Sequence, residues 1–177
     1  MGAIKVRVAN PADYPDLARI YANTIFAGFP AHQRAALVTG HHVALAAENT
    51  VLLVAEAFGT VVGGIGISGH KNHLTPNVED GELQVFWCGV EPEWQGKGIG
   101  RLLISSVITS LRNSTIECTR LVMQILETRH TAIRLAEASG AVRNPSRGGM
   151  NEDADPYQTF EIDVTSGARK VNDGKAS

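Results

Sequence analysis

Residues 92–103 read PEWQGKGIGRLL and place Gly96, Gly98 and Gly100 at every second position, between an apolar run and a helix-like one. Glycines let a backbone approach a ligand closely, and the first turn of a helix presents unpaired N–H groups and a positive dipole end. These features favour a site for a phosphate or another anion. On the glycines alone, a plain strand-to-helix turn with tight packing remains the alternative.

Two common phosphate-binding motifs do not fit this turn. A P-loop needs GxxxxGK followed by Ser or Thr, whereas Gly98 follows Lys97 and Glu91 stands where the first glycine should be. A dinucleotide fingerprint needs GxGxxG and an acid about 20 residues further on. The turn reads GxGxG and has no acid well placed at that distance, so neither motif explains it.

The elements around the turn are predicted from periodicity and from helix caps. Apolar or alternating runs predict strands over residues 4–8, 51–57, 60–68, 82–90, 120–126 and 157–164. Helical spacing predicts helices after Asn10, over 31–47 with an interruption at Gly40, from about 98 to 112, and over 128–139. Residues 144–156 are predicted to be a loop. The order indicates a mixed α/β fold with an antiparallel first half.

Length and composition indicate one domain, over residues 1–165, followed by a flexible tail at 166–177. The chain has 177 residues, of which 44% are hydrophobic and 19% charged, as in ordinary globular proteins. A net charge of −2 argues against nucleic acid as a partner. No signal segment or long apolar stretch is present, so we expect a cytoplasmic protein without a membrane partner.

The histidines and cysteines do not predict a metal site. His70 and His73 have a plausible ligand spacing, but no third ligand is nearby in the sequence. Cys88 and Cys118 lie in apolar runs and lack the spacing of metal ligands or of a disulfide framework. We therefore expect no metal and two free thiols.

The stretch GVEPEWQGKGIGRLL resembles the acyl-CoA-binding motif of the GNAT superfamily of N-acetyltransferases, whose signature is Q/R-x-x-G-x-G/A. Gln95, Gly98 and Gly100 occupy the signature positions. The opening VRVANPADYPDLARIY, the predicted hairpin and the segment TAIRLAEASGA follow in the family's order, so the resemblance covers about residues 4–164. It implies an α/β fold with a mixed, mostly antiparallel central sheet and flanking helices.

The resemblance also implies the function and the residues that bind the cosubstrate. The protein would move an acetyl group from acetyl-CoA directly to a primary amine. The strand edge from Trp87 to Val90, including Cys88, would pair with the pantetheine arm, and the N–H of Val90 would face the thioester carbonyl. The pyrophosphate would lie on the backbone of Gln95, Gly96, Lys97, Gly98, Ile99, Gly100 and Arg101. Lys97 and Arg101 either add charge there or are simply solvated.

The chain departs from the family where the acid and base are expected. Gln84 stands where members that resemble histone acetyltransferases carry a glutamate base, and it could hold a water but not take a proton. Glu82 lies on the same strand face and is the candidate base, unless it is an exposed glutamate at the start of the strand. Ala136 stands where many members carry a proton-donating tyrosine. Tyr157 is the candidate substitute, although packing would also explain it.

Two more features concern the ligands. Arg129 replaces a family asparagine and would reach a CoA phosphate. The acceptor is expected to be a small-molecule amine, drawn by an acidic cluster of Glu152, Asp153 and Asp155, unless this cluster is merely solvated. The alternative function is an acyl-CoA-binding module with little or no catalytic activity. The sequence allows a homodimer but does not set the oligomeric state.

Overall fold

A computed structural model describes residues 4–48, 50–69, 75, 77–151 and 153–165. The expected tail at 166–177 lies outside these residues, as do His70, His73 and Glu152.

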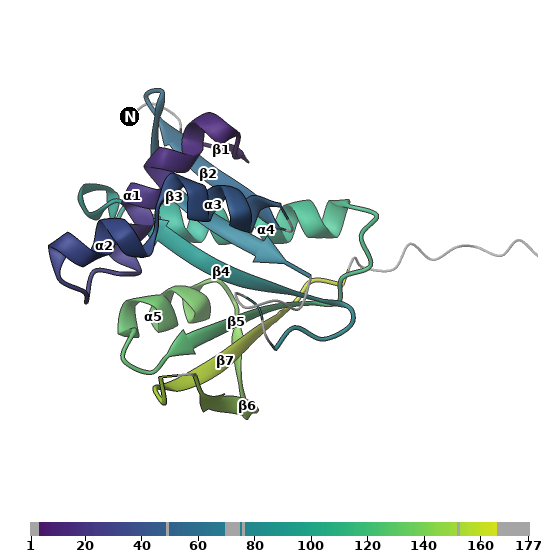
Figure 1. Cartoon of the computed structure of the whole chain (residues 1–177). Helices are drawn as coiled ribbons and strands as arrows, with labels where there is room; N and C mark the ends of the chain where they lie inside the picture. The colour runs from purple at the N-terminus through teal and green to yellow at the C-terminus, as the bar shows by residue number, and fades with distance from the viewer. Residues whose placement is uncertain (1–3, 49, 70–74, 76, 152, 166–177) are drawn as a thin grey trace, which may run out of the picture.

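The described residues form a seven-stranded sheet in the order β1-β2-β3-β4-β5-β7-β6 (Figure 1). The β4–β5 pair is parallel and the other neighbouring pairs are antiparallel, which confirms the predicted mixed, mostly antiparallel sheet. The strands are β1 (Lys5–Val8), β2 (Val51–Ala57), β3 (Thr60–Ser68), β4 (Glu82–Val90), β5 (Arg120–Leu126), β6 (Val142–Met150) and β7 (Pro156–Asp163).

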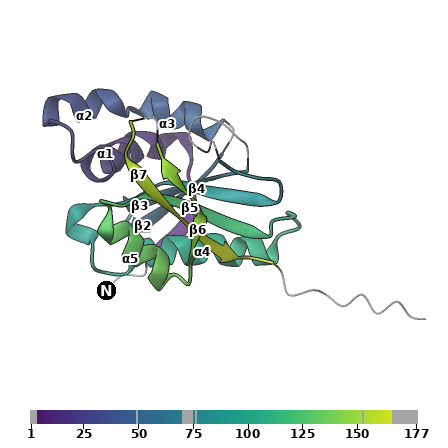
Figure 2. The same cartoon turned by 90° about the horizontal axis from the view of Figure 1, so that it is seen from below.

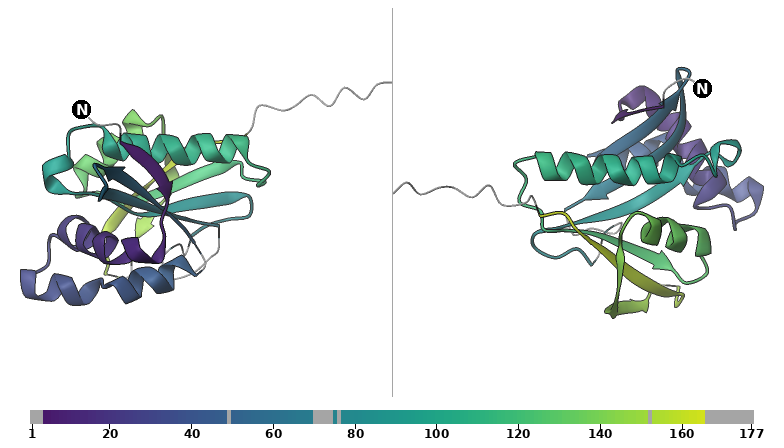
Figure 3. Two further views of the ribbon diagram at one scale, coloured as in Figure 1. Left: turned by 90° about the horizontal axis from the view of Figure 1, so that it is seen from above. Right: turned by 180° about the vertical axis from the view of Figure 1, so that it is seen from behind.

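Helices cover both faces of the sheet, as Figures 2 and 3 show. The helices are α1 (Tyr14–Thr24), α2 (Ala31–Leu37), α3 (Gly40–Ala47), α4 (Ile99–Asn113) and α5 (His130–Ala138). Helices α1, α2 and α3 lie on one side and α4 and α5 on the other, so the sheet separates two apolar clusters. The chain between α1 and α2 therefore lies on one face of the sheet, and the glycine turn at the start of α4 lies on the other.

The predicted helix over residues 31–47 is two helices in the structure. It breaks at Val38 and Thr39, just before Gly40, and both residues have extended backbones. The Thr39 hydroxyl accepts a hydrogen bond from the N–H of His42, which caps α3. The expected interruption is thus confirmed within two residues.

Residues 144–156 were predicted to be a loop, and that prediction was wrong for most of the segment. Val142–Met150 forms β6, which pairs with β7 at the edge of the sheet. The register of this pair shifts between Asn144 and Gly149. Because Pro145 and two glycines interrupt the alternation typical of a strand, this bulged edge strand has no sequence pattern of its own.

Helix α1 packs closely against β3 and the last residues of β4. A Cβ atom on Gly89 would lie only 2.6 Å from the Thr24 hydroxyl oxygen, and one on Gly64 would lie 2.2 Å from a methyl group of Leu17. Larger residues would push α1 away from the sheet. The C-terminal end of α1 therefore lies directly beside the last residues of β4.

Candidate active site

The site begins where the two parallel strands of the sheet separate. Register pairs between β4 and β5 run from Glu82 with Arg120 to Val85 with Met123 and stop there, although both strands continue. Trp87 has a φ of 47°, and the register between β3 and β4 shifts beside it. This bulge turns β4 away from β5, so the edges of both strands are open beyond it.

A pocket of about 850 Å³ occupies this gap and reaches both faces of the sheet. Its wall on the α1 side contains Asn23, Thr24, Ile25 and Ala27. The walls on the other side come from the glycine turn and from the starts of α4 and α5. Strand residues from Val85 to Val90 and from Met123 to Leu126 line the middle. The predicted strand edge and glycine turn thus belong to one cavity.

The glycines of the turn have two different structural roles. Gly96 and Gly98 have φ values of 73° and 81°, a region that residues with a Cβ rarely adopt, and a Cβ on either would meet nothing within 4 Å. Gly98 is the N-cap of α4 and leaves the cap without a side-chain acceptor. Gly100 instead allows α4 to pack on α5, since its Cβ would lie 2.9 Å from a methyl group of Leu135.

The side chains of the turn brace its backbone. The Gln95 side-chain amide donates to the carbonyl oxygen of Val90 at 2.9 Å. Lys97 Nζ donates to the carbonyl oxygen of Glu93 at 2.9 Å and lies 4.6 Å from the ring centroid of Trp94. These contacts hold the turn in one shape while the first backbone N–H groups of α4 have no intrahelical partner. Arg101 is exposed and lines the pocket.

Arg129 lines the pocket from the N-cap position of α5 and reaches across to the end of α1. Its Nη2 donates to the carbonyl oxygen of Ile25 at 2.6 Å, and its Nη1 donates to that of Thr24 at 3.5 Å. A cation is favourable there, because the C-terminal end of a helix carries partial negative charge. The side chain therefore links the two walls of the pocket.

Two further residues limit the chemistry inside the pocket. Burial raises the pKa of the half-buried Cys88 thiol to about 12, so this thiol stays protonated at neutral pH. Ala136, which the resemblance places where a proton-donating tyrosine is expected, lines the pocket and has no proton to donate.

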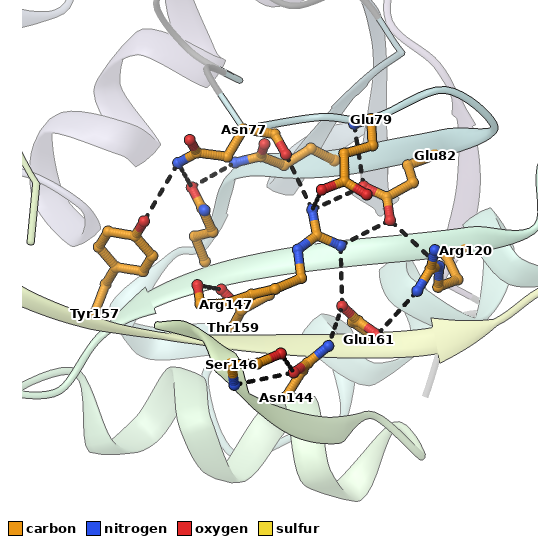
Figure 4. A network of polar contacts seen from close by, with 12 residues as sticks. Asn77, Glu79, Glu82, Arg120, Asn144, Ser146, Arg147, Tyr157, Thr159 and Glu161 are labelled. Carbon is orange, nitrogen blue, oxygen red and sulfur yellow. Dashed lines mark hydrogen bonds and ion pairs between the residues drawn. The ribbon is translucent and has the colours of Figure 1, made fainter. Parts of the chain in front are cut away.

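Glu82 is buried in an ionic cluster and does not line the pocket (Figure 4). Arg147 donates to both of its carboxylate oxygens, at 2.7 and 2.9 Å, and Arg120 lies 3.3 Å from one of them. Burial alone would raise the pKa of Glu82, but the hydrogen bonds from Arg147 and from the N–H of Glu79, together with both positive charges, lower it. Glu161 also binds Arg147, at 2.9 Å.

Gln84 and Tyr157 do not line the pocket, but hydrogen bonds through Gln124 and Asn77, two residues that the sequence did not single out, link them to it. The Gln84 side-chain N–H₂ donates to Gln124 Oε1 at 3.2 Å, and Gln124 lines the pocket. Asn77 donates to the same oxygen at 3.2 Å and to the Tyr157 hydroxyl at 3.4 Å, as Figure 4 shows for Asn77 and Tyr157. The oxygen of Gln84 is buried and has no partner among the described residues.

Sequence reasoning missed Arg147, Asn77 and Gln124 because each lies far along the chain from its partner. Arg147 fell in the segment predicted to be a loop, and only the pairing of β6 with β7 places it over β4 and β5. Gln124 interrupts an otherwise apolar strand, which was a usable signal of a buried polar contact.

Other expectations concern groups outside the pocket. Asp153 and Asp155 are exposed and absent from its lining. In the part of the chain that the structure describes, no three His, Cys, Asp or Glu side chains gather as metal ligands would. No helix in those ranges has the length and apolar character needed to cross a membrane.

Comparison with known proteins agrees with this geometry. A model of the acetyltransferase (GNAT) family matches residues 15–141, so the chain belongs to the GNAT family of acetyltransferases. A search of curated proteins found no match.

Solved structures share the fold at low sequence identity. The ribosomal-protein-S18-alanine N-acetyltransferase of Escherichia coli is 16% identical, with a TM-score of 0.70 over 96% of this chain and 99% of that one. The ribosomal-protein-alanine N-acetyltransferase of Brucella melitensis is 21% identical, with a TM-score of 0.69 over 90% and 99%. The yncA protein of Salmonella typhimurium, solved with its cofactor acetyl-CoA, is 20% identical, with a TM-score of 0.63 over 94% and 97%.

Proposed function

We propose that this protein transfers the acetyl group of acetyl-CoA directly to a primary amine of a small molecule. The observation that carries the proposal is the pocket at the separation of β4 and β5. One of its walls is the glycine turn at the start of α4, and the opposite wall is the end of α1. Two ligands that enter from opposite faces of the sheet would meet in the gap.

The residues of the turn fit the phosphates of acetyl-CoA. Gly96 and Gly98 leave open space beside the first amides of α4, and the positive end of this helix favours negative charge. Arg101 adds a cation next to these amides. Bound there, acetyl-CoA would supply an acyl thioester that an amine can attack, and the open edge of β4 from Trp87 to Val90 would align its pantetheine arm.

The transfer requires two proton movements besides the exchange of bonds. The amine nitrogen forms the new C–N bond, the thioester C–S bond breaks, the amine loses a proton and the sulfur gains one. Thiols have pKa values near 8.5, so returning the second proton is a modest demand at neutral pH. Tyr157 is our candidate donor, since Ala136 has none to give.

For the first proton, Glu82 remains a candidate that a variant can test. A carboxylate bound by Arg147 and Arg120 is a weak base, so the role would require one of these contacts to open. Glu82→Gln should reduce amine-dependent turnover and leave acetyl-CoA affinity unchanged if Glu82 takes the proton. Unchanged turnover would remove it from the mechanism.

A second candidate function is an acyl-CoA-binding module with little catalysis, which Ala136 and Gln84 favour. To separate the two, acetyl-CoA affinity is measured by calorimetry and free CoA thiol is followed with a panel of amines. Amine-dependent release of thiol supports the transferase. Tight binding without turnover across the panel supports the module, and absence of acetyl-CoA binding contradicts both.

A further inference from the structure

The charged side chains that line the pocket are positively charged. Among the described residues its charged and titratable side chains are Arg101 on α4, Arg129 and His130 at the start of α5, and Cys88 on β4. Arg101 lies beside the turn, where phosphates would neutralise it. Arg129 lies at the end of α1 and keeps its charge near the gap. No described carboxylate lines the cavity to balance the charge of an ammonium group.

The acids next to lining residues in the chain, and those considered above as base or acceptor site, are paired or lie at the surface. Glu91 pairs with Arg19, and Glu127 is exposed and accepts a hydrogen bond from Gln158. The Glu82 side chain is 0% exposed and is bonded to Arg147 and Arg120. Asp153 and Asp155 are exposed outside the cavity lining. A protonated alkylamine entering the gap would therefore lose water without gaining a counter-ion, which favours its neutral form.

Besides these cations, the lining contains uncharged polar groups, of which Gln124 lies in the middle of the gap on β5. Gln124 lines the cavity and accepts hydrogen bonds from Gln84 and Asn77, and Asn77 also donates to the Tyr157 hydroxyl. The oxygen of Gln84 is buried, has no partner among the described residues and lies outside the cavity lining, so Gln124 is the amide that a water or an N–H group in the gap can contact. An amide can orient such a group, but it cannot take its proton at neutral pH.

We propose that the acceptor is a weakly basic amine, such as the α-amino group of an amino-acid amide, which enters the gap already neutral. This inference rests on the proposed acetyl transfer and specifies its acceptor. The α-amino group beside a carbonyl differs from an alkylamine in how much of it is neutral at pH 7. Because their pKa values are about 8 and about 10.4, the neutral fractions differ on the order of 100-fold.

The test compares two small amines that share the CH3–CH(NH2)– unit, alaninamide and sec-butylamine, at saturating acetyl-CoA between pH 6 and pH 10. For alaninamide we expect log kcat/KM to rise with a slope of one and to level off at about pH 8. For sec-butylamine it should rise with a slope of one across the whole range, because the pKa of an alkylamine lies above about 10. At pH 7 alaninamide should be preferred on the order of 100-fold, and the preference should shrink as the pH rises toward 10. A flat profile for sec-butylamine between pH 6.5 and pH 8.5 would overturn the inference, since it would mean that the ammonium form is accepted.

A variant that supplies a carboxylate provides a second, independent readout. Gln84→Glu keeps the shape of the side chain, and its carboxylate would lie within reach of Gln124 at the gap. We expect it to raise kcat/KM for sec-butylamine relative to alaninamide and to flatten the pH profile, while Gln84→Ala should keep the slope of one. An unchanged preference in a folded Gln84→Glu protein would count against the inference.

Failure of the acetyl-transfer activity can be told apart from failure of the acceptor class. If acetyl-CoA binds and neither amine is acetylated, the transferase proposal fails together with this inference. If sec-butylamine is acetylated as well as or better than alaninamide at pH 7, the transferase stands and the acceptor class is wrong.

Discussion

At the scale of single residues, Gly98 joins the turn to the first residue of α4 with a φ of 81° and no side chain to cap the helix. An N-cap is usually Ser, Thr, Asp or Asn, whose side chain takes up one of the free amides. Glycine gives up that bond, so the amides stay available to a ligand. If these amides bind the phosphates as we propose, the helix start gives up local stability in favour of ligand binding.

Replacing Gly98 should show this exchange. Gly98→Ala forces a Cβ into the left-handed region, which costs about 1–2 kcal/mol, and should weaken acetyl-CoA binding by shifting the first amides of α4. Gly28→Ala is the control, because a Cβ there meets nothing within 4 Å and its φ is not positive. Urea unfolding and calorimetric titration measure the two effects. Full affinity in Gly98→Ala would contradict a role for these amides.

Glu82 should make stability depend on acidic pH. Its pKa in the folded protein lies below the ordinary value of 4.5 because of Arg147, Glu79 N–H and Arg120. The stabilisation is therefore complete above that value and is lost as pH falls through the lower folded pKa. Glu82→Gln should unfold about 2–3 kcal/mol more easily at pH 7. Its free energy of unfolding should also decline less between pH 5 and pH 3 than that of the unchanged protein.

The sequence predicts local residue roles better than distant ones. The positions of Gln95 and the glycines could be read from spacing, because the turn is made by consecutive residues. The burial of Glu82 could not, since its partners Arg147 and Arg120 come from other strands. For the same reason the link from Gln84 to Tyr157 was invisible.

At the scale of elements, hydrogen bonds and ion pairs of Arg147 hold the β6–β7 hairpin against β4. This side chain bonds Glu82 and Glu161 and the carbonyl oxygen of Asn77, so it connects β6, β4, β7 and the chain before β4. The hairpin carries Tyr157, and its position fixes that hydroxyl relative to the gap.

Removing the Arg147 side chain should therefore lower the stability of the folded protein. Arg147→Ala leaves the buried carboxylate of Glu82 without its main partner, and we expect a loss of about 3–5 kcal/mol. Arg143→Ala on the same strand is the matched control, because Arg143 is exposed. Thermal unfolding compares the two, and hydrogen exchange should show faster exchange in β6 and β7 of Arg147→Ala. Equal stability of both variants would contradict the role of the cluster.

Strands and helices with clear periodicity were predicted correctly, whereas β6 was not. The predicted ranges 51–57, 60–68, 82–90 and 120–126 coincide with β2, β3, β4 and β5. These strands are central or adjoin the core, so their apolar residues follow the burial of the sheet. Strand β6 lies at the edge and forms only because β7 pairs with it.

At the scale of the whole molecule, acetyl-CoA should stabilise the folded chain, because the pocket proposed to bind it is lined by elements from both halves of the sequence. A ligand at 100 times its Kd adds about 2.7 kcal/mol to the free energy of unfolding. For a chain of 177 residues this corresponds to a rise in Tm of roughly 5–10 °C. Differential scanning fluorimetry with acetyl-CoA measures the rise. Gly98→Ala should reduce it, and Gly28→Ala should keep it.

The separation of β4 from β5 has a kinetic consequence. It opens the sheet to both faces, so a donor and an acceptor could occupy the gap at the same time. The Cys88 thiol stays protonated at neutral pH, and it is therefore poorly suited to carry the acetyl group between them. We expect a sequential mechanism with a ternary complex. Initial rates measured at several fixed acceptor concentrations should give intersecting reciprocal plots, whereas parallel lines would indicate an acetylated protein. The gap between β4 and β5 would then explain why both substrates bind before the first product leaves.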